Sequence, residues 1–261
     1  MNYHIVKVAP PIVRYCLKYF ERFKNMQIKV SSYNILHCED FLKEKIDYEL
    51  FAETIDKFNS DVVGLNEVHG EGPCDEYDEQ AEILGKKIGC GYYFSKATEL
   101  DGNNPFGNAV LSRLPIKSCT TIPIPDPDPK TGDGYYETRA LLKMTTNTNP
   151  ELTFLITHFG LNEDEQFNAV KTVLDNIPEK NCILMGDFNV KPCNKILDPI
   201  REQMIDAAKD TEPFTFPSDK PNRKIDYIFV SNDISVKSFY TEDVVLSDHL
   251  AVSAELKIDD I

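Results

Sequence analysis

Short continuous runs of apolar residues alternate along the chain with stretches in which apolar residues recur every three or four positions. The continuous runs are typical of buried strands, whereas the recurring pattern is typical of helices with one apolar face. The helical pattern covers 46–58, 81–88 and 167–177. Strands are expected at 28–33, 62–65, 92–95, 107–112, 137–144, 152–156, 182–185, 225–230, 236–240 and 250–256. This alternation predicts an α/β fold from Gln27 onward.

The stretch 181–191, NCILMGDFNVK, is the centre of this pattern. Its apolar run from Cys182 to Met185 predicts a strand covered on both faces, which ends at Gly186 and places Asp187 and Asn189 just beyond its carboxyl end. Open α/β sheets bind their ligands at that edge. Asp and Asn are also ordinary turn formers after a strand. That explanation weakens because four more apolar runs end in the same kind of residue.

The other polar residues at predicted strand ends are of few chemical types. Each has an ordinary explanation, such as a turn, a solvated strand end or a hydrogen-bonded core histidine. Asp226 is the exception, because it lies inside the apolar run 225–229. A buried carboxylate costs several kcal/mol unless it is paired, so it requires a partner such as a histidine. The complete set is Asn34, Glu67, His158, Asp187, Asn189, Asp226 and the pair Asp248-His249.

Such a set supports the hydrolysis of a phosphoester. Carboxylate and amide oxygens are hard ligands that suit Mg²⁺ or Mn²⁺ rather than zinc. A bound metal neutralises phosphate charge and stabilises the leaving oxygen. A histidine oriented by a buried Asp can hold the imidazolium that phosphate oxygens attract. An Asp beside an Asn can position and activate water.

Composition narrows the function classes. The 261 residues correspond to one large domain or two small ones, and 43 Asp and Glu against 28 Lys and Arg give a net charge of −15. This charge argues against a protein that coats nucleic acid, but a bound divalent metal would reverse the field at a phosphoester site. Seven cysteines without a C-x-x-C pair indicate reduced packing thiols. We find no membrane-spanning apolar run and no secretory signal, so the cytosol is the expected compartment.

Residues 1–26 form a basic N-terminal extension in this interpretation. Residues 1–25 hold five basic residues and one acidic residue, which leaves −19 for the remainder of a chain of net −15. Apolar residues follow Pro10-Pro11 at helical spacing. Such an amphipathic helix either touches a membrane surface, packs on the main domain, or is an extension ahead of a start at Met26. We favour the last two explanations over membrane contact. Farther along, 121–134 (TIPIPDPDPKTGDG) predicts an irregular surface loop.

Seven short motifs occur in an order that resembles one known family. They are SYNIL within 31–36, GLNEV (64–68), GNAVLSR (107–113), THFGL (157–161), GDFN (186–189), KIDYIF (224–229) and SDH (247–249). The chain resembles the endonuclease/exonuclease/phosphatase family of metal-dependent phosphohydrolases over residues 27–257. The resemblance implies a catalytic domain at 27–261. It also implies a four-layer α/β sandwich, in which two mixed β-sheets pack face to face with helices outside.

The resemblance implies roles for individual residues. Glu67 would be the principal Mg²⁺ ligand, with Mn²⁺ as a substitute. Asn34 and Asp248 would be metal or phosphate contacts. Asp187 would orient or deprotonate the attacking water, and Asn189 would hold a phosphate oxygen.

The remaining roles concern the phosphate. His249, supported by Asp226, would stabilise the pentacoordinate phosphorus, and His158 would make a second phosphate contact. Arg139 would contact phosphate or brace Glu67. The resemblance leaves open whether Asp187 or His249 is the general base, and whether one metal or two are bound. Asn66 departs from the Gln that many members have before the Glu, so its amide has a shorter reach.

The expected reaction is metal-assisted in-line attack of water on a phosphodiester or phosphomonoester. The substrate is a small molecule or nucleic acid, and a monomer is the default assembly. A nuclease would need a basic rim, whereas a membrane-lipid phosphodiesterase would use residues 1–25 to reach its substrate. The phosphatase signature W-x-G-D-x-N-Y-R is missing from a chain that has no Trp. A non-catalytic binding module is disfavoured, because Glu67, Asp187, Asp226 and His249 are all present.

Overall fold

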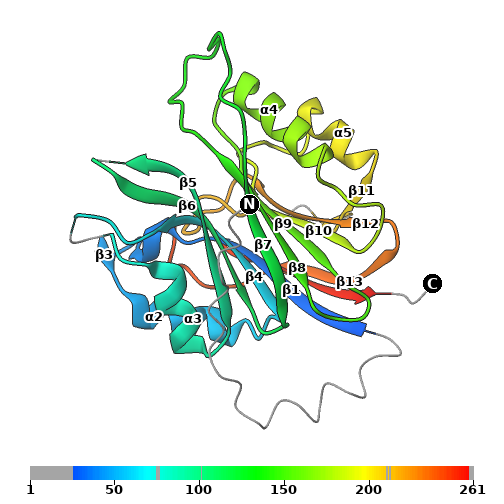
Figure 1. The fold of residues 1–261 in the computed structure, drawn as a ribbon, viewed down its shortest axis with the longest axis horizontal. Coiled ribbons are helices and arrows are strands. Elements are labelled where there is room, and N and C mark those ends of the chain that lie inside the picture. The colour runs from blue at the N-terminus through cyan, green and yellow to red at the C-terminus, as the bar shows by residue number, and fades with distance from the viewer. Residues whose placement is uncertain (1–25, 75–76, 101, 210, 212, 259–261) are drawn as a thin grey trace.

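Two six-stranded sheets packed face to face form the centre of the protein (Figure 1). The computed structural model describes residues 26–74, 77–100, 102–209, 211 and 213–258. The helix expected within residues 1–25 lies outside the described residues.

The first sheet surrounds one parallel pair of strands. Its order is β13 (Ile234–Thr241), β14 (Val252–Ile258), β1 (Met26–Asn34), β4 (Val62–His69), β6 (Asn104–Ser112), β5 (Gly91–Leu100). The strands β1 and β4 run parallel, and the other neighbours are antiparallel. A small hairpin of β2 (Glu39–Asp40) and β3 (Lys45–Ile46) lies beyond β1 in the chain.

The second sheet repeats this plan. Its order is β11 (Met204–Asp206), β12 (Asp226–Ser231), β10 (Cys182–Asp187), β9 (Thr153–His158), β8 (Ala140–Thr146), β7 (Ile116–Pro123). Here β9 and β10 are the parallel pair, and the other neighbours are antiparallel. Each sheet therefore has two strands whose carboxyl ends lie at the same edge.

Helices cover the outer face of each sheet (Figure 1). The helices α2 (Tyr48–Lys57) and α3 (Gln80–Ile88) pack on the first sheet, and α4 (Glu163–Leu174) and α5 (Asp198–Arg201) pack on the second. Short 3-10 turns occupy Leu36–Cys38 and Lys195–Leu197. The order helix, sheet, sheet, helix confirms the expected four-layer α/β sandwich. No helix in the described part of the chain has the length and apolar character needed to cross a membrane.

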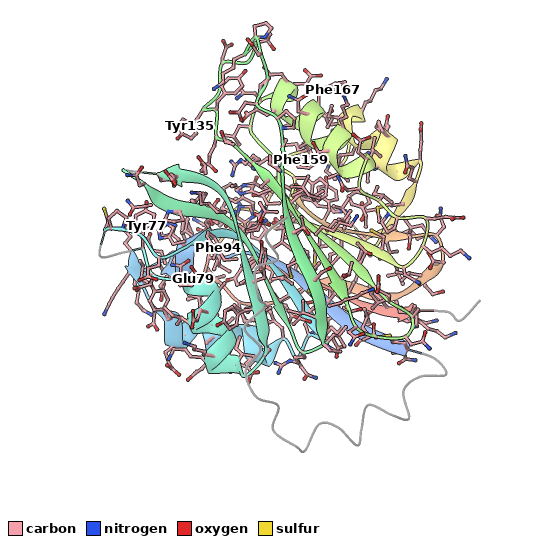
Figure 2. The ribbon with its side chains drawn as sticks, in the orientation of Figure 1. Tyr77, Glu79, Phe94, Tyr135, Phe159 and Phe167 are labelled. Atoms are coloured by element: carbon pink, nitrogen blue, oxygen red, sulfur yellow. The ribbon has the colours of Figure 1, made fainter. Side chains whose placement is uncertain are left out.

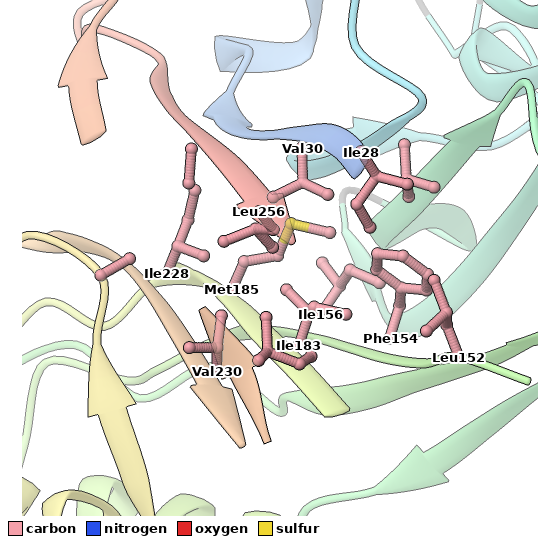
Figure 3. Close-up of a cluster of buried hydrophobic side chains, with 14 of the residues drawn as sticks. Ile28, Val30, Leu152, Phe154, Ile156, Ile183, Met185, Ile228, Val230 and Leu256 are labelled. Atoms are coloured by element: carbon pink, nitrogen blue, oxygen red, sulfur yellow. The ribbon is translucent and has the colours of Figure 1, made fainter. Parts of the chain in front are cut away.

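Alternation along the buried strands builds three separate cores. In β9, Phe154 and Ile156 face the other sheet, whereas Leu155 faces the helices. The cluster between the sheets holds side chains from both of them (Figure 3). Gly64 permits the close approach of the two sheets, because a Cβ there would lie 2.9 Å from the Ile156 side chain. This packing fixes one sheet edge against the other, and the polar strand ends lie along that edge.

Several sequence expectations differ in detail from the structure. The strand β7 was not expected, because an edge strand that is half exposed lacks a continuous apolar run. It extends to Pro123 and shortens the expected loop, whose Gly134 N–H donates to Asn162 Oδ1 at 2.7 Å. The predicted strand 137–144 begins only at Ala140. The helical apolar pattern 167–177 begins at Phe167, but this side chain is 61% exposed on the outside of α4 (Figure 2).

Candidate active site

The polar strand ends of the two sheets meet at one edge of the sandwich. The parallel strands β1 and β4 deliver Asn34 and Glu67 there, and β9 and β10 deliver His158 and Asp187. The antiparallel strand β12 begins at the same edge, and its first residue, Asp226, is opposite Asp187 in the register. Residues far apart in the sequence thus converge because parallel strands share their carboxyl edge.

A β-bulge directs Glu67. The pairing of β4 with β6 shifts between Leu65 and Val68, so Asn66 and Glu67 stand outside the regular ladder. Glu67 has a φ of 55°, which is unusual for a residue with a side chain. Its carboxylate accepts a hydrogen bond from Asn34 Nδ2 at 2.8 Å. The same nitrogen lies 3.3 Å from Asp187 Oδ2, so Asn34 joins carboxylates from the two sheets.

Asn66 ties the two sheets together beside this carboxylate pair. Its Nδ2 donates to Asn108 Oδ1 at 2.8 Å and to the carbonyl of Thr157 at 2.9 Å. Its Oδ1 accepts from the backbone N–H of Asp187 at 2.9 Å. Asn108 continues the network by donating to the carbonyl of Ala140 at 2.9 Å. Sequence reasoning noted Asn66 only as a departure from a family pattern and assigned no role to Asn108, although both lie in the quoted motifs.

His249 lies between two buried carboxylates. Its Nδ1 is 2.9 Å from Asp226 Oδ2, and its Nε2 is 3.6 Å from Asp187 Oδ2. Burial by itself would lower the pKa of His249, but Asp226 and Asp187 outweigh it and raise the pKa to about 10. The imidazole is therefore held as a cation. The ring of Phe216 packs on it with a centroid separation of 4.8 Å, a contact that the sequence did not indicate.

His158 is held in the opposite charge state. Burial, and then the positive charge of Arg139, lower its pKa well below the ordinary value. Arg139 Nη1 lies 2.9 Å from His158 Nδ1. A guanidinium can only donate, so Nδ1 carries the lone pair and the proton lies on Nε2. That Nε2–H faces Asp187 Oδ2 at 3.4 Å, and the side-chain nitrogen of Asn189 lies 3.2 Å from the same ring atom.

Arg139 pairs with Glu137 rather than with Glu67, which is one of the two contacts that the family resemblance implies. No hydrogen bond or ion pair joins it to Glu67 among the described residues. Its guanidinium instead forms an ion pair with the half-buried Glu137, at 2.6 Å between Nη1 and Oε1. Burial raises the pKa of Glu137, Arg139 opposes the rise, and the nearby charge of Glu67 adds to it. Glu137 precedes the predicted active-site Arg139 by two residues, and no sequence signal singled it out.

Asn189 and Asp248 occupy different positions relative to the centre of the site. The backbone N–H of Asn189 donates to Asp187 Oδ1 at 2.8 Å, and its side chain donates to the carbonyl of Phe159 at 3.0 Å. Its φ of 51° places it in the left-handed region, which Asn tolerates. Asp248 is half-buried and accepts from Ser247 Oγ at 3.2 Å. Within the described residues, no hydrogen bond or ion pair joins it to Asn34 or Glu67.

The donor atoms of the site fit a hard divalent cation. Glu67 and Asp187 present carboxylate oxygens toward the same amide, and the buried Asp226 Oδ1 has no hydrogen-bond partner among the described residues. One oxygen or nitrogen from each of Asp187, Asp226 and His249 lies within 4.8 Å of the others. Because His249 is held as a cation, it is a poor ligand. The oxygen-rich side at Glu67 therefore suits a metal better than the histidine side does.

The fold is a four-layer sandwich, and one edge of it gathers carboxylates, amides and two histidines in opposite charge states. These features define a class of two-sheet α/β proteins with a polar reaction centre. The sequence comparison identifies the family within that class. Residues 31–249 match the Endonuclease/Exonuclease/phosphatase family, and the chain belongs to this family. Its members are typically hydrolases that act on phosphoester bonds. A comparison with curated proteins found no match.

Solved structures of similar fold come from several organisms. An endonuclease/exonuclease/phosphatase from Beutenbergia cavernae has a TM-score of 0.75 and 22% identity, covering 89% of this chain and 72% of that one. Mannosyl-6-phosphatase Bt3783 from Bacteroides thetaiotaomicron has a TM-score of 0.67 and 20% identity, covering 88% and 99%. D. rerio TDP2, complexed with a single-strand DNA product, has a TM-score of 0.61 and 15% identity, covering 88% and 99%.

Proposed function

We propose that the protein is a divalent-metal-dependent phosphoesterase that hydrolyses its substrate by in-line attack of water. The observation that carries the proposal is the chain of contacts from Asp226 through His249 to Asp187 and on to His158. It places a cationic imidazole and a neutral imidazole on either side of one buried carboxylate. Family membership supports the same reaction.

Each side chain would do one task in this reaction. His249 would donate from Nε2 to a phosphate oxygen, with its charge maintained by Asp226. His158 would donate from its Nε2–H to a second oxygen, since Arg139 fixes the proton on that atom. Asp187 would accept the proton of the attacking water, and Asn189 holds Asp187 in place. We favour Asp187 over His249 as the general base, because His249 is already protonated.

Glu67 would hold the metal together with Asn34 and the oxygens beside it, and we propose Mg²⁺, with Mn²⁺ as a substitute. The bound cation would neutralise the charge of the phosphate and of the leaving oxygen. Asp248, which lies next to His249 in the chain, would contact the metal or the phosphate from the outer side of the site. The amide of Asn34 donates to both Glu67 and Asp187 and so lowers the repulsion between the two carboxylates. A bound cation would lower the same repulsion.

The first test measures hydrolysis of bis(4-nitrophenyl) phosphate and 4-nitrophenyl phosphate with and without Mg²⁺ or Mn²⁺. We expect metal-dependent turnover of at least one ester, and its loss in His249→Ala. Glu151→Gln is the control, because Glu151 is an exposed residue paired with Lys117 away from the site. The ester that reacts faster distinguishes a diesterase from a monoesterase.

A second readout does not require the right substrate. Binding of Mn²⁺ measured by calorimetry should weaken in Glu67→Gln and remain in Glu151→Gln. If Mn²⁺ binds equally to both variants and no ester is hydrolysed, the proposed metal-dependent activity is wrong. Equal loss of Mn²⁺ binding in Asp226→Asn and Glu67→Gln would place the metal between the two carboxylate groups rather than at Glu67.

A further inference from the structure

A cavity of about 290 Å³ lies between the segments 191–193 and 214–224. Its lining includes Lys191, Phe214, Asn222, Arg223 and Lys224, and we call it the Lys191–Arg223 pocket. The volume is just below the usual range of about 300–1,000 Å³ for ligand pockets, so it suits a group as small as a phosphate with one ring. Its cationic lining contrasts with the net charge of −15 of the whole chain.

The pocket and the active site share their backbone segments. Lys191 follows Asn189 by two residues, and Arg223 precedes Asp226 by three. The guanidinium of Arg223 lies over the Phe216 ring, 5.1 Å from its centroid, and that same ring packs on His249. The pocket is therefore one aromatic ring away from the imidazole proposed to contact the scissile phosphate.

The loop that carries Arg223 is fixed relative to His249. Phe216 and Arg223 form an antiparallel bridge, in which Arg223 N–H donates to the carbonyl of Phe216 at 3.2 Å. The backbone N–H of Leu250 donates to the carbonyl of Thr215 at 2.8 Å, which joins this loop to the segment of His249. The loop that carries Arg223 is therefore held in place by hydrogen bonds within the loop and to the His249 segment.

The charges in the pocket are not equally available. Lys224 is 2% exposed and pairs with Asp206 at 2.9 Å, so its charge is already neutralised. Lys191 and Arg223 are both exposed, and neither forms an ion pair with a described residue. Asn222 Oδ1 accepts from Arg223 Nε at 3.3 Å, which leaves the terminal nitrogens of the guanidinium for a ligand. Two cations without an acidic partner in the described part of the chain are able to bind an additional phosphate group.

An aromatic side chain stands at the same pocket. Phe214 is 51% exposed, although a large apolar ring is ordinarily covered. Cations beside an exposed ring are the combination by which proteins bind successive phosphates and bases of a single-stranded chain. The exposed ring and the cationic pair lie in one cavity, so a single ligand can contact both.

We propose that the Lys191–Arg223 pocket binds a second phosphate group of the substrate, adjacent to the phosphoester that is hydrolysed. The inference rests on the proposed phosphoesterase function and narrows its substrate class to esters that carry a further phosphate. The second phosphate belongs either to a nucleotide, whose base would stack on Phe214, or to a small bisphosphate without a ring. The two sources share the chemistry that Lys191 and Arg223 recognise.

The test compares two esters that differ by one phosphate. They are the 4-nitrophenyl ester of thymidine 5′-phosphate and the same ester with an added 3′-phosphate, assayed with Mg²⁺. In the unmodified chain we expect the 3′-phosphate to raise kcat/KM by about tenfold or more, mainly through KM, as a pair of charge-assisted hydrogen bonds would. The gain should fall as salt is added, because both cations are exposed.

The same ratio is measured in the double variant Lys191→Gln/Arg223→Gln. We expect the advantage of the 3′-phosphate to shrink to twofold or less. The matched control, Lys171→Gln/Lys237→Gln, removes two exposed lysines outside the pocket and should keep the full ratio. An unmodified chain that gains nothing from the 3′-phosphate, or a double variant that keeps the gain, overturns the proposal.

A third ester identifies the source of the phosphate. It is a 4-nitrophenyl phosphodiester of propane-1,3-diol with a phosphate on the other hydroxyl, which has the second phosphate but no ring. An equal gain with this ester supports a pocket for phosphate alone. A gain confined to the nucleotide, and reduced by Phe214→Ala, supports a nucleotide pocket. In both cases the gain must disappear in Lys191→Gln/Arg223→Gln.

Cys193 provides a readout that is independent of hydrolysis. It is exposed and lines the same pocket, whereas the exposed Cys74 belongs to a distant segment of the chain. Thymidine 3′,5′-bisphosphate should slow the reaction of Cys193 with a thiol reagent at least fivefold, and thymidine 5′-phosphate should have a smaller effect. Cys74 should react at an unchanged rate. Protection without turnover would contradict the proposed function and keep the pocket, whereas turnover without protection would contradict the pocket alone.

Discussion

The candidate active site has one half on each sheet. The two halves differ in the burial of their carboxylates and in the charged partners that these carboxylates have. Glu67, on the first sheet, is half-buried, stands on a bulge and has Asn34 as its hydrogen-bond partner. On the second sheet, Asp187 and Asp226 are each 1% exposed, and both contact His249. The carboxylate of the first half is partly open to solvent and has no cationic partner among the described residues, whereas the two carboxylates of the second half are closed off and share the cationic His249.

This difference indicates that the first half suits metal binding and the second suits proton transfer. A half-buried carboxylate that lacks a cationic partner can accept a metal at a lower desolvation cost than a fully buried one. A closed set of carboxylates and imidazoles fixes where protons are located, which is what proton transfer requires. We therefore expect changes on the first sheet to be sensitive to metal concentration and changes on the second sheet to be insensitive to it.

The largest effect is expected from Asp187→Asn. The variant keeps the shape of the side chain and removes the proposed base, so kcat should fall by about 10²- to 10⁴-fold. The loss should be the same at low and at saturating Mg²⁺, as measured by initial rates. Asp198→Asn, at an exposed position on α5, should change kcat by less than about twofold, since surface changes away from a site are nearly neutral. If added Mg²⁺ restored the kcat of Asp187→Asn, the two halves would not differ in their dependence on metal.

Glu67→Gln should have the next largest effect. The variant loses the charge that holds the cation, and we expect the apparent metal affinity to fall by about 10- to 100-fold or more. Activity should recover in part as Mg²⁺ is raised, in contrast with Asp187→Asn. A metal titration of the rate measures this recovery. A loss that no Mg²⁺ concentration reverses would assign Glu67 to proton chemistry instead.

Asn66→Ala should affect stability more than the two changes above. Its removal leaves the backbone N–H of Asp187 and the side chain of Asn108 without their buried partner, at a cost of roughly 1–3 kcal/mol. Chemical denaturation measures the free energy of unfolding. Asn168→Ala, which loses one exposed hydrogen bond to Pro125, is the matched control and should cost less than about 0.5 kcal/mol. Equal costs for the two variants would mean that Asn66 does not tie the sheets together.

The smallest effect is expected from Arg139→Gln. The variant removes the cation that helps to lower the pKa of His158, so that pKa should rise and the proton should no longer be confined to Nε2. We expect a fall in kcat of about tenfold, less than the 10²- to 10⁴-fold of a lost acid or base, because His158 itself remains. Nuclear magnetic resonance of the His158 ring measures the protonation directly. An unchanged His158 titration would show that burial alone sets its charge.

The same pKa shift predicts a dependence of stability on pH. His158 has a pKa in the folded state that lies below its unfolded value of about 6.5, so the unfolded chain binds more protons as the pH falls. The contribution of His158 to stability is therefore present at neutral pH and is lost progressively below about pH 6.5. In Arg139→Gln this loss should be smaller, because the folded pKa is closer to the unfolded one.

The positions of the polar strand ends could be predicted from the sequence because strand direction fixes them. Once 62–65 and 182–185 are recognised as buried strands, Glu67 and Asp187 must lie near the carboxyl edges of their sheets. The requirement of Asp226 for a partner follows from the cost of a buried carboxylate, and the structure provides His249.

Contacts between the sheets could not be predicted in the same way. The bond between Asn66 and the backbone of Asp187 depends on how closely two sheets approach, which no single strand encodes. The pairing of Arg139 with Glu137 and His158 depends on where β8 begins, three residues later than expected. Edge strands such as β7 lack a continuous apolar run, and the exposure of Phe167 depends on the rotation of α4.

The left-handed backbone at Glu67 has a consequence for how the sequence is free to change. An L-residue in that conformation costs roughly 1–2 kcal/mol, a penalty that glycine escapes. Glu67→Gly should thus give a more stable protein that has lost its proposed metal ligand. Laboratory evolution for heat resistance alone would drift toward glycine at this position, and only simultaneous selection for turnover would keep the glutamate there.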